Sequence, residues 1–459
     1  MSFILESLGQ LCKLVVLDIS NNPWEGVITE AHLMNLSSLE EFSIGNQFYN
    51  ISMVFNISPN WILPFKLRRL NIKSCQLGPK FPAWLQKQNH LITLVLENAS
   101  ISDIIPDWFF QLDLRLHNLD FAHNNISGRV PNKLMFFPSS TMDLGSNQFD
   151  GPLTLFSSNI STLSLNNNMV CGSIPSDIGK EMPIGNIPPE FYGLSMLHIL
   201  DLSRNNLSGH NPHCLGNLSK MKSGWIELDG FLAASTKGSL KMVRKRREME
   251  YNYSILYLAD SIDLSDNNLS GEIPAELTSL IKLQTLNLSA NHLTRKIPAN
   301  IGNLTMLETL DLSRNKIFSP IPVSMTSLTF LNHLNLSYNN LTGKIPTANQ
   351  FLTFDDPSIY QGNAGLCGKP FDNDCLSSSQ FGTSRGEKEE KDDDVEDKTQ
   401  EVGFYISIVL GFIVGSWGVI GSLIINKSWR YTYFGFAQRV NDTCFVLFHR
   451  MFRGRNVAE

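Results

Sequence analysis

A nine-residue frame recurs through this sequence with the form Leu-x-x-Leu-x-Leu-x-x-Asn, in which x is variable. Four consecutive copies fit it closely: ADSIDLSDN (259–267), with Ala259 in the first position, LQTLNLSAN (283–291), LETLDLSRN (307–315) and LNHLNLSYN (331–339). Their final asparagines follow one another at intervals of 24 residues: Asn267, Asn291, Asn315 and Asn339. A fixed period of this length indicates a solenoid, in which each repeat stacks on its neighbours.

Looser copies of the frame precede these four. They are LVVLDISNN (14–22), LEEFSIGNQ (39–47), LRRLNIKSC (67–75), LITLVLENA (91–99), LHNLDFAHN (116–124), SSTMDLGSN (139–147), ISTLSLNNN (160–168) and LHILDLSRN (197–205). The total is about twelve repeats, where about three suffice for a stable stack. The interval from Asn168 to Asn205 is 37 residues, too long for one repeat and too short for two. A deletion within a repeat and a loop carried by one repeat both explain it, which leaves the stacking there open.

The alternation of leucine with variable residues predicts a short strand with one buried face in every repeat. Each repeat then turns a corner, where backbone N–H and C=O groups lose their strand partners, and unpaired buried polar groups are costly. An asparagine side chain has two donor hydrogens and an acceptor oxygen, so it can bond those groups in neighbouring turns. We therefore predict that Asn291 and its counterparts form a structural ladder. Cys75 takes the same position in an early repeat, where the pattern tolerates Asn or Cys.

Composition and the absence of catalytic motifs limit the classes of function. The net charge of −6 gives no general attraction to nucleic acid. The sequence contains no HExxH, GxSxG or paired CxxC motif, and we predict no enzymatic activity, no cofactor and no metal site. The aspartates of the Leu-Asp-Leu-Ser copies are expected at exposed strand positions rather than in a catalytic site: Asp201, Asp263 and Asp311.

An apolar segment near the C-terminus predicts a membrane anchor. Residues 403–425, GFYISIVLGFIVGSWGVIGSLII, are 23 positions without a charged side chain, long enough to cross a bilayer. Acidic residues dominate before it and basic residues after it, which predicts a cytosolic C-terminus and repeats outside. A buried helix of a globular domain is the alternative. Small residues recur every four positions and form a stripe that admits a partner helix: Gly403, Ser407, Gly411 and Gly415.

Sequons for N-linked glycosylation support the outside location. The candidates are Asn35, Asn50, Asn98, Asn125, Asn159, Asn206, Asn217, Asn252, Asn268, Asn287, Asn303, Asn335 and Asn340. Asn56 is a weaker acceptor because Pro59 follows its sequon. The sequon density therefore favours, without requiring, a glycoprotein.

The cysteines add a prediction for the end of the solenoid. Cys367 and Cys375 lie close together just after the last repeat. A disulfide between them would close a cap over the exposed core in an oxidising compartment. Four other cysteines have no obvious mates, Cys12, Cys75, Cys171 and Cys214, and Cys444 is expected in the cytosol.

Two segments depart from the repeats. The first 14 residues carry Glu6 and no long apolar run, so they do not match a secretory signal, and we expect a chain cut off at its start, without an N-terminal cap. Between Cys214 and Ile262 the frame is absent, and this insertion contains the basic run KMVRKRREMEY (241–251). A nuclear signal or a nucleic-acid patch is one reading, but a solvated loop or a binding element is favoured for a solenoid that lies outside the cell.

Taken together, these features resemble one known family. The repeat LxxLxLxxNxLxGxIP, an interruption with four repeats after it, QFLTFDDPSIYQGNAGLCGKPFDNDC, the acidic stretch, the apolar span and KSWRYTYF are similar to those of plant leucine-rich-repeat receptor-like proteins. The resemblance implies an α/β solenoid, a leucine-rich-repeat horseshoe with an island insertion and one transmembrane helix. It also implies a kinase-less, resistance-type cell-surface receptor, a class that acts chiefly in pathogen recognition and sometimes in development.

On this basis the chain divides into seven parts. They are an N-terminal block of repeats (1–209), the island insertion (210–258), four further repeats (259–346), a C-terminal cap (347–384), an acidic juxtamembrane segment (385–402), the transmembrane helix (403–425) and a short basic cytoplasmic tail (426–459). The family usually has a Lys-Gly pair before Glu-x-x-Tyr in the island, whereas this chain has Lys245-Arg246 there. The island's usual contacts are therefore not carried over.

The resemblance implies partners as well. They are an extracellular peptide, protein or glycan ligand, an adaptor receptor-like kinase at the transmembrane helix, and a co-receptor kinase at the island and the last repeats, with no nucleic acid. We place ligand specificity on the concave strand surface of the early repeats, whose variable positions carry ionisable groups: Arg68, Arg69, Lys73, Glu97, His117, Asp120 and His123. Two alternatives stay open, a non-functional truncated receptor fragment and a secreted repeat protein that inhibits a wall-degrading enzyme.

Overall fold

The computed structural model describes residues 4–45, 53–153, 156–175, 194, 196–223, 239–244, 247–252, 259–371 and 375. The chain separates into two units, residues 1–376 and 377–459, and all described residues belong to the first. Several predictions lie outside the described residues: segment 385–402, the span 403–425 with its small-residue stripe, the tail 426–459, Lys245-Arg246 and the sequon at Asn50. Within the described residues, no helix has both the length and the apolar character needed to cross a bilayer.

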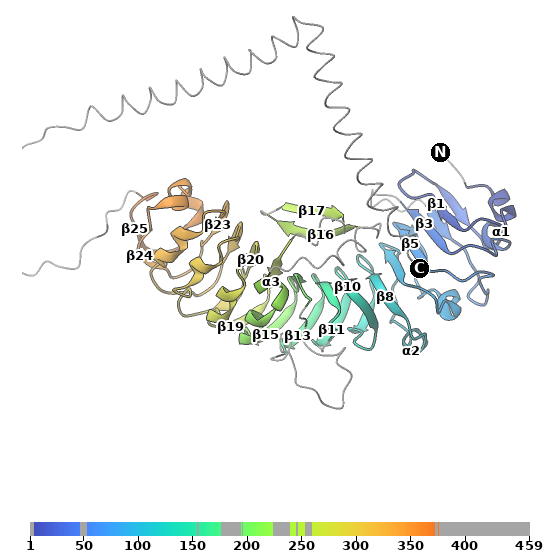
Figure 1. The fold of residues 1–459 in the computed structure, drawn as a ribbon, viewed down its shortest axis with the longest axis horizontal. Helices are drawn as coiled ribbons and strands as arrows, with labels where there is room; N and C mark the ends of the chain where they lie inside the picture. The colour runs from blue at the N-terminus through green and yellow to red at the C-terminus, as the bar shows by residue number, and fades with distance from the viewer. Residues whose placement is uncertain are drawn as a thin grey trace, which may run out of the picture. The chain divides into compact units, whose positions relative to one another are not determined.

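The repeats form one long parallel sheet, which Figure 1 shows running through the stack. Within the described residues this first sheet has twelve strands, in chain order: β1 (Val16–Asp18), β3 (Glu41–Gly45), β5 (Arg69–Lys73), β7 (Thr93–Glu97), β8 (Arg115–Asp120), β10 (Met135–Asp143), β12 (Ile160–Ser164), β14 (Ile199–Asp201), β18 (Ser261–Asp263), β20 (Thr285–Asn287), β22 (Thr309–Asp311) and β23 (His333–Asn335). Each of the twelve sequence frames supplies one strand. The predicted leucine-rich-repeat solenoid is therefore confirmed.

Stacking continues across both irregular intervals of the sequence. β12 pairs in parallel with β14, with Leu163 opposite Leu200, although their frames are widely spaced in the chain. β14 then pairs with β18 across the insertion, with Leu200 opposite Ile262. These pairings support the reading in which one repeat carries a loop after residue 168.

The ladder asparagines bond backbone groups of two successive repeats. Nδ2 of Asn291 donates to the carbonyl oxygen of Leu264 in the preceding repeat at 2.9 Å, and Oδ1 accepts from the N–H of Leu269 at 2.9 Å. Nδ2 also reaches the carbonyl oxygen of Ser289 in its own repeat at 3.1 Å. The same arrangement recurs at Asn124, Asn147, Asn168, Asn205, Asn267, Asn315 and Asn339. The predicted structural role of these amides is confirmed.

The ladder extends into the C-terminal cap. Asn363 lies 24 residues after Asn339, its Nδ2 donates to the carbonyl oxygen of Leu336 at 3.0 Å, and its Oδ1 accepts from the N–H of Leu341 at 2.9 Å. β24 (Thr342–Lys344) pairs in parallel with β25 (Gly365–Cys367). A disulfide joins Cys367 and Cys375, the pair expected to close the cap. The cap therefore begins as one more turn of the solenoid.

A second line of short parallel strands follows the ladder positions, which the sequence analysis did not predict. It consists of two sheets: β2 (Gly26–Ile28), β4 (Met53–Phe55) and β6 (Cys75–Gln76); then β9 (Ser127–Arg129), β11 (Gln148–Pro152), β13 (Met169–Ser173), β15 (Asn206–His210), β19 (Asn268–Gly271) and β21 (His292–Leu293). Several of these strands contain a glycine in the left-handed region, such as Gly271 with φ +80°. Glycine adopts this conformation without steric cost, so the chain can turn away from the second line there.

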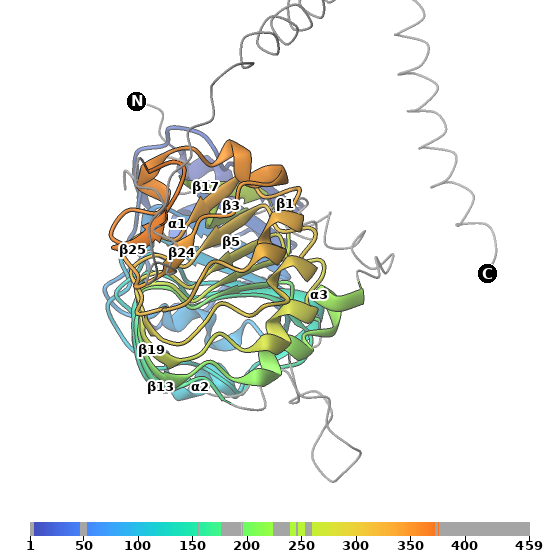
Figure 2. The same ribbon diagram turned by 90° about the vertical axis from the view of Figure 1, so that its left-hand side faces the viewer.

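Short helices complete most repeats, and Figure 2 views the stack from the end that carries β24 and β25. They are η1 (Glu6–Gln10), α1 (Glu30–Leu33), η2 (Ala83–Lys87), α2 (Asp107–Phe110), η4 (His213–Asn217), α3 (Ser219–Ser223), η5 (Ala275–Ser279), η6 (Ile301–Asn303), η7 (Val323–Ser327), η8 (Asn349–Thr353) and η9 (Pro357–Ile359), where η denotes a 3-10 helix. A proline often precedes the helix, as Pro274 does before η5, because its fixed φ suits a helix start. Leucines at the helical side, such as Leu277 and Leu280, are buried with the strand leucines in one continuous core.

The insertion begins later than residue 210. Leu215, Leu218 and Met221 are buried in the common core, and the N–H of Lys282 in the next repeat donates to the carbonyl oxygen of Met221 at 3.0 Å. Residues 210–223 therefore complete the repeat that starts at Leu197. Further on, β16 (Ser239–Arg244) and β17 (Arg247–Asn252) form an antiparallel hairpin.

Candidate ligand-binding surface

The first sheet has one face on the leucine core and one face that carries the variable positions of the frame, which we call the open face. Because all strands are parallel and in register, equivalent positions of successive repeats line up in rows. One row contains Arg69, Thr93, Asn118 and Thr141. Another contains Val95, Asp120, Asp143 and Ser164. Side chains that are about 24 residues apart in sequence are thus immediate neighbours.

The three cations among the predicted ligand-surface residues all lie next to glutamates. Nζ of Lys73 lies 2.6 Å from Oε2 of Glu97, Nε of Arg69 lies 3.8 Å from Oε1 of Glu41, and Nη1 of Arg68 lies 4.0 Å from Oε2 of Glu40. Each pair joins adjacent strands of the open face. The positive charges are therefore balanced locally, which weakens any general attraction for an anion.

Asp120 was expected to be exposed, but only 1% of it is accessible. Its Oδ1 accepts a hydrogen bond from the N–H of Ala122 at 3.0 Å, so the short side chain folds back onto its own turn. Burial, followed by the charges of Glu97 and Asp143, raises the pKa of Asp120 well above its usual range. Asp120 is therefore a buried member of the Lys73–Glu97 cluster rather than a free acid on the surface.

The same correction applies to two of the three aspartates of the Leu-Asp-Leu-Ser copies, whereas Asp311 is only partly buried. Asp201 and Asp263 are buried, and Oδ1 of each accepts a hydrogen bond from the hydroxyl of the serine two residues later, at 2.7 and 2.6 Å. Flanking strands cover such short side chains, and the turn supplies hydrogen bonds for the carboxylate. Burial raises the pKa of Asp263 to about 7. These residues stabilise turns, and their exposure was wrongly predicted.

An irregularity in β10 builds the most distinctive feature of the open face. Phe136 pairs with Leu116 and Thr141 with Asn118, so five steps along β10 oppose two steps along β8. The surplus residues form a bulge, and bulges redirect side chains. The ring of Phe137 stacks on the imidazole of His117, with centroids 4.3 Å apart and planes 19° apart. The guanidinium carbon of Arg115 lies 4.7 Å from the centroid of the same ring.

The charge state of His117 follows from its surroundings. Burial, then the positive charges of Arg69 and Arg115, lowers the pKa of His117. A neutral imidazole at pH 7 has one donor and one acceptor nitrogen, and its ring stacks on Phe137 without carrying a charge. We call Arg115, His117 and Phe137 the aromatic cluster.

Asn118 lies beside the aromatic cluster, and its amide has no partner in the described part of the chain. It is 1% exposed, and neither Oδ1 nor Nδ2 has a hydrogen-bond partner among the described residues. A buried unpaired amide is costly, and native proteins keep few of them, often at binding sites. The open face therefore carries an apolar ring beside a cation, and an unsatisfied amide is buried next to them on β8.

The remaining predicted residues are placed as follows. His123 lies in the turn after β8, with a φ of 58°, and Glu97 is the last residue of β7. The sequence analysis missed Arg115 and Phe137. The signal that was available is the stretch MFFPSSTMDLGSN around the sixth frame, in which Ser139 replaces the first leucine and two phenylalanines and a proline precede it.

The sequons differ in accessibility. Seven have exposed asparagines: Asn35, Asn125, Asn206, Asn217, Asn268, Asn303 and Asn340. Asn98, Asn159 and Asn287 are partly buried, and Asn252 ends β17. Asn335 is 5% exposed, and its Nδ2 donates to Oδ2 of Asp311 at 3.0 Å. The nitrogen to which a glycan would be attached is thus engaged inside the sheet at Asn335.

No metal centre accompanies this surface within the described residues, because no three His, Cys, Asp or Glu side chains gather closely enough to hold an ion. The chemistry that the open face offers is recognition by stacking, ion pairing and amide hydrogen bonds.

Comparisons with known proteins agree with the fold. The family model described as Leucine Rich Repeat matches residues 196–218, 260–280, 282–304, 306–328 and 330–352. Receptor-like protein EIX2 of Solanum lycopersicum is 36% identical, over 90% of this chain and 51% of the relative. Receptor-like protein EIX1 of the same species is also 36% identical, with 90% and 51% covered. The chain thus spans about half the length of these relatives.

A solved structure is similar as well. The LRR ectodomain of the Arabidopsis thaliana membrane receptor kinase GASSHO1/SCHENGEN3, in complex with CASPARIAN STRIP INTEGRITY FACTOR 2, matches 81% of this chain and 44% of its own, with 26% identity and a TM-score of 0.53. The similarity covers the repeats, and the repeats contain both lines of strands.

Proposed function

Because the chain belongs to the plant leucine-rich-repeat receptor-like proteins, we propose that it is a cell-surface receptor that binds an extracellular ligand on its open face. In this proposal it passes the signal to a partner receptor kinase, as kinase-less receptors of this class require. The repeats lie outside the cell, the segment 403–425 crosses the plasma membrane and the C-terminus is cytosolic. The process is plant defence.

The aromatic cluster carries this proposal. Phe137 is only partly buried, and its ring contacts both the imidazole of His117 and the guanidinium of Arg115. A rigid aromatic ring beside a cation contributes strongly to recognition because it buries apolar area with little loss of side-chain entropy.

Neighbouring groups define what the ligand should contain. Asn118 carries a buried amide without a hydrogen-bond partner among the described residues, and the Lys73–Glu97 ion pair joins the two preceding strands, β5 and β7. These groups suit a peptide or protein ligand with an apolar or aromatic anchor and main-chain amides. Because Arg68, Arg69 and Lys73 are paired with glutamates, the proposal does not require an acidic ligand.

The first experiment concerns location. The full-length chain, tagged at its C-terminus, is expressed in plant cells and its gel mobility is compared before and after glycosidase treatment. A large downward shift is expected, because seven exposed sequons are available to a chain whose repeats enter the lumen. No shift would place the repeats in the cytosol and contradict a role in surface reception.

The second experiment concerns the open face. Leaf cells that express the chain are treated with a fractionated fungal culture filtrate, and the oxidative burst is compared with that of cells without the chain. Phe137→Ala and His117→Ala are expected to reduce a chain-dependent burst at least five-fold, whereas the control Val323→Ala, at an exposed residue of η7, leaves it unchanged. Equal bursts from all variants would overturn the assignment of the ligand to the open face.

A further inference from the structure

An Ile-Pro motif that follows the second-line position places an isoleucine in the core of six repeats, including all four after the insertion. The isoleucines at this position are all buried: Ile105, Ile174, Ile273, Ile297, Ile321 and Ile345. In the repeat that precedes the insertion the motif reads His-Asn-Pro-His, so Asn211 stands where the others have isoleucine. An amide thus occupies a position that the repeat reserves for a core aliphatic side chain.

Asn211 forms no compensating hydrogen bond with the part of the chain that the structure describes. It is 3% exposed, and neither Nδ2 nor Oδ1 has a hydrogen-bond partner among the described residues. In this respect it is the opposite of the ladder asparagines, whose amides are saturated by backbone groups. Replacing isoleucine by an unpaired amide loses apolar burial and leaves two polar atoms desolvated, so the residue weakens the stack at this point.

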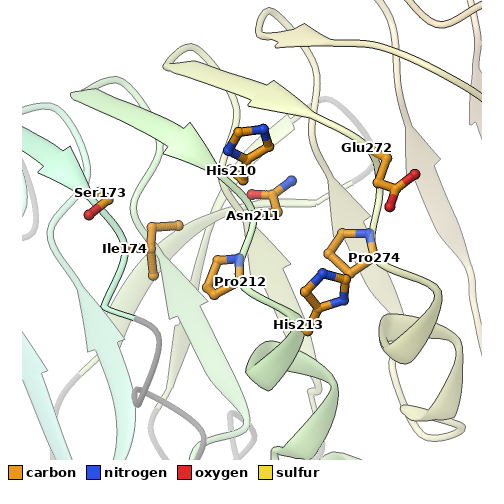
Figure 3. A pocket seen from close by; sticks show the side chains of 8 residues that line it. All are labelled: Ser173, Ile174, His210, Asn211, Pro212, His213, Glu272 and Pro274. Carbon is orange, nitrogen blue, oxygen red and sulfur yellow. The ribbon is translucent and has the colours of Figure 1, made fainter.

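A cavity of about 390 Å³ lies at the same place, as Figure 3 shows. Its walls come from three successive repeats: Ser173 and Ile174 after β13, His210 to His213 after β15, and Glu272 and Pro274 after β19. In Figure 3 the amide of Asn211 lies among these side chains, close to His210. The volume is at the lower end of the range for small-ligand pockets.

The charged groups at the rim already have partners. Nδ1 of His213 lies 2.7 Å from Oε2 of Glu276, and this hydrogen bond raises the pKa of His213 and lowers that of Glu276. Oε2 of Glu272 lies 3.9 Å from Nε of Arg295. The buried unpaired group of the wall, the amide of Asn211, is neutral, which favours a neutral ligand over an ion.

We propose that this cavity is a second binding site, which takes a main-chain amide of an extended peptide segment. Nδ2 of Asn211 donates to the peptide carbonyl and Oδ1 accepts from the peptide N–H, so one planar group satisfies both unpaired atoms. Ile174, Pro212 and Pro274 supply apolar walls for the flanking side chain. A sugar would need an aromatic platform to stack on, and the described wall contains no Phe, Tyr or Trp. This site is separate from the open face and does not depend on the proposed receptor function.

The test uses the purified full-length chain and a neutral probe, N-acetyl-trialanine N′-methylamide, observed by saturation-transfer NMR. The wild-type chain is expected to bind the probe with a dissociation constant on the order of 1 mM, because few contacts are made. Asn211→Ile restores the residue of the other repeats, and Asn211→Ala removes the amide without filling the space. Both are expected to reduce the transfer signal at least five-fold.

Thermal unfolding checks that the variants are folded. Asn211→Ile is expected to raise the unfolding midpoint by about 2 °C or more, since a core position regains its aliphatic side chain. Ile297→Asn, which places an amide in the same slot of another repeat, is the matched control; it should lower the midpoint and leave probe binding unchanged. An absent wild-type signal, or an undiminished signal in Asn211→Ala, would overturn the proposal. So would binding of chitotetraose in place of the peptide probe.

Discussion

Nζ of Lys73, on β5, lies 2.6 Å from Oε2 of Glu97, on β7, and the two residues are directly opposed in the parallel register. Because both side chains are largely buried, the pair is worth more than an exposed ion pair, and we expect a coupling free energy of about 1 kcal/mol. Lys73→Met, Glu97→Gln and the double variant form a cycle that urea unfolding measures. Additive effects of the two single changes would show that the contact does not stabilise the sheet.

Because of the asparagine ladder, we expect the truncation of one ladder asparagine to lower the free energy of unfolding strongly. Asn291→Ala removes the partner of the Leu264 carbonyl and of the Leu269 N–H, both in the interior. The expected loss is about 2–4 kcal/mol of unfolding free energy, since each buried group left unpaired costs about 1–3 kcal/mol. Asn332→Ala, at an exposed position of a later frame, is the control and should change stability by less than about 0.5 kcal/mol. Similar losses for both variants would contradict the ladder.

Because of His198, we expect the folded chain to lose stability against unfolding in acid. It is buried, its Nδ1 lies 3.1 Å from the carbonyl oxygen of Ala259, and burial lowers its pKa from 6.5 to about 4. The unfolded chain therefore takes up the proton first as the pH falls, and the stabilisation present above pH 6.5 is lost towards pH 4. His198→Asn retains a donor and cannot titrate, so its unfolding midpoint should vary less over this range. An unchanged pH profile would exclude His198 as the responsible group.

For Asp143 we expect the opposite dependence, in which its contribution to stability falls as the pH rises. Burial raises its pKa from 3.8 to about 7, so the folded chain retains a proton that the unfolded chain has lost. The contribution of Asp143 is fully present below pH 3.8 and declines as the pH rises towards 7. Asp143→Asn keeps an oxygen for the N–H of Gly145, which now donates at 2.9 Å. This variant should be more stable than the wild type at pH 7 and equal to it at pH 4; lower stability at pH 7 would contradict the assignment.

Two sequons five positions apart predict different glycan occupancy. Asn335 is buried and donates to Asp311, whereas Asn340 is exposed at the turn that precedes β24. In plant cells Asn340→Gln should increase gel mobility by one glycan step, and Asn335→Gln should not. A mobility change with Asn335→Gln would show that a glycan is accommodated where the structure places a hydrogen bond within the sheet.

The sequence alone determined the architecture, because the solenoid repeats the same short pattern of buried leucines and a corner asparagine. A buried leucine at every second strand position and an asparagine at each corner satisfy apolar and polar groups within two adjacent turns. Asn291 could therefore be assigned from spacing and chemistry. Asn363 lies at the same 24-residue spacing and belongs to the ladder. The sequence analysis left it in the C-terminal cap, and no leucine frame precedes it.

Only the tertiary structure decided what the variable positions do. Lys73 meets Glu97, Asp120 is covered by its neighbours, and Phe137 reaches His117, because stacking brings together side chains that are a full repeat apart in the chain. A periodic pattern specifies which face of the sheet a residue occupies, but it does not specify which side chain of the neighbouring repeat that residue contacts. The bulge in β10 and the unpaired amide of Asn211 break the repeat, and their consequences depend on the walls that adjacent repeats supply. The spacing of leucines and asparagines within each repeat determines that the repeats stack, whereas contacts between side chains of neighbouring repeats determine the chemistry of the surface.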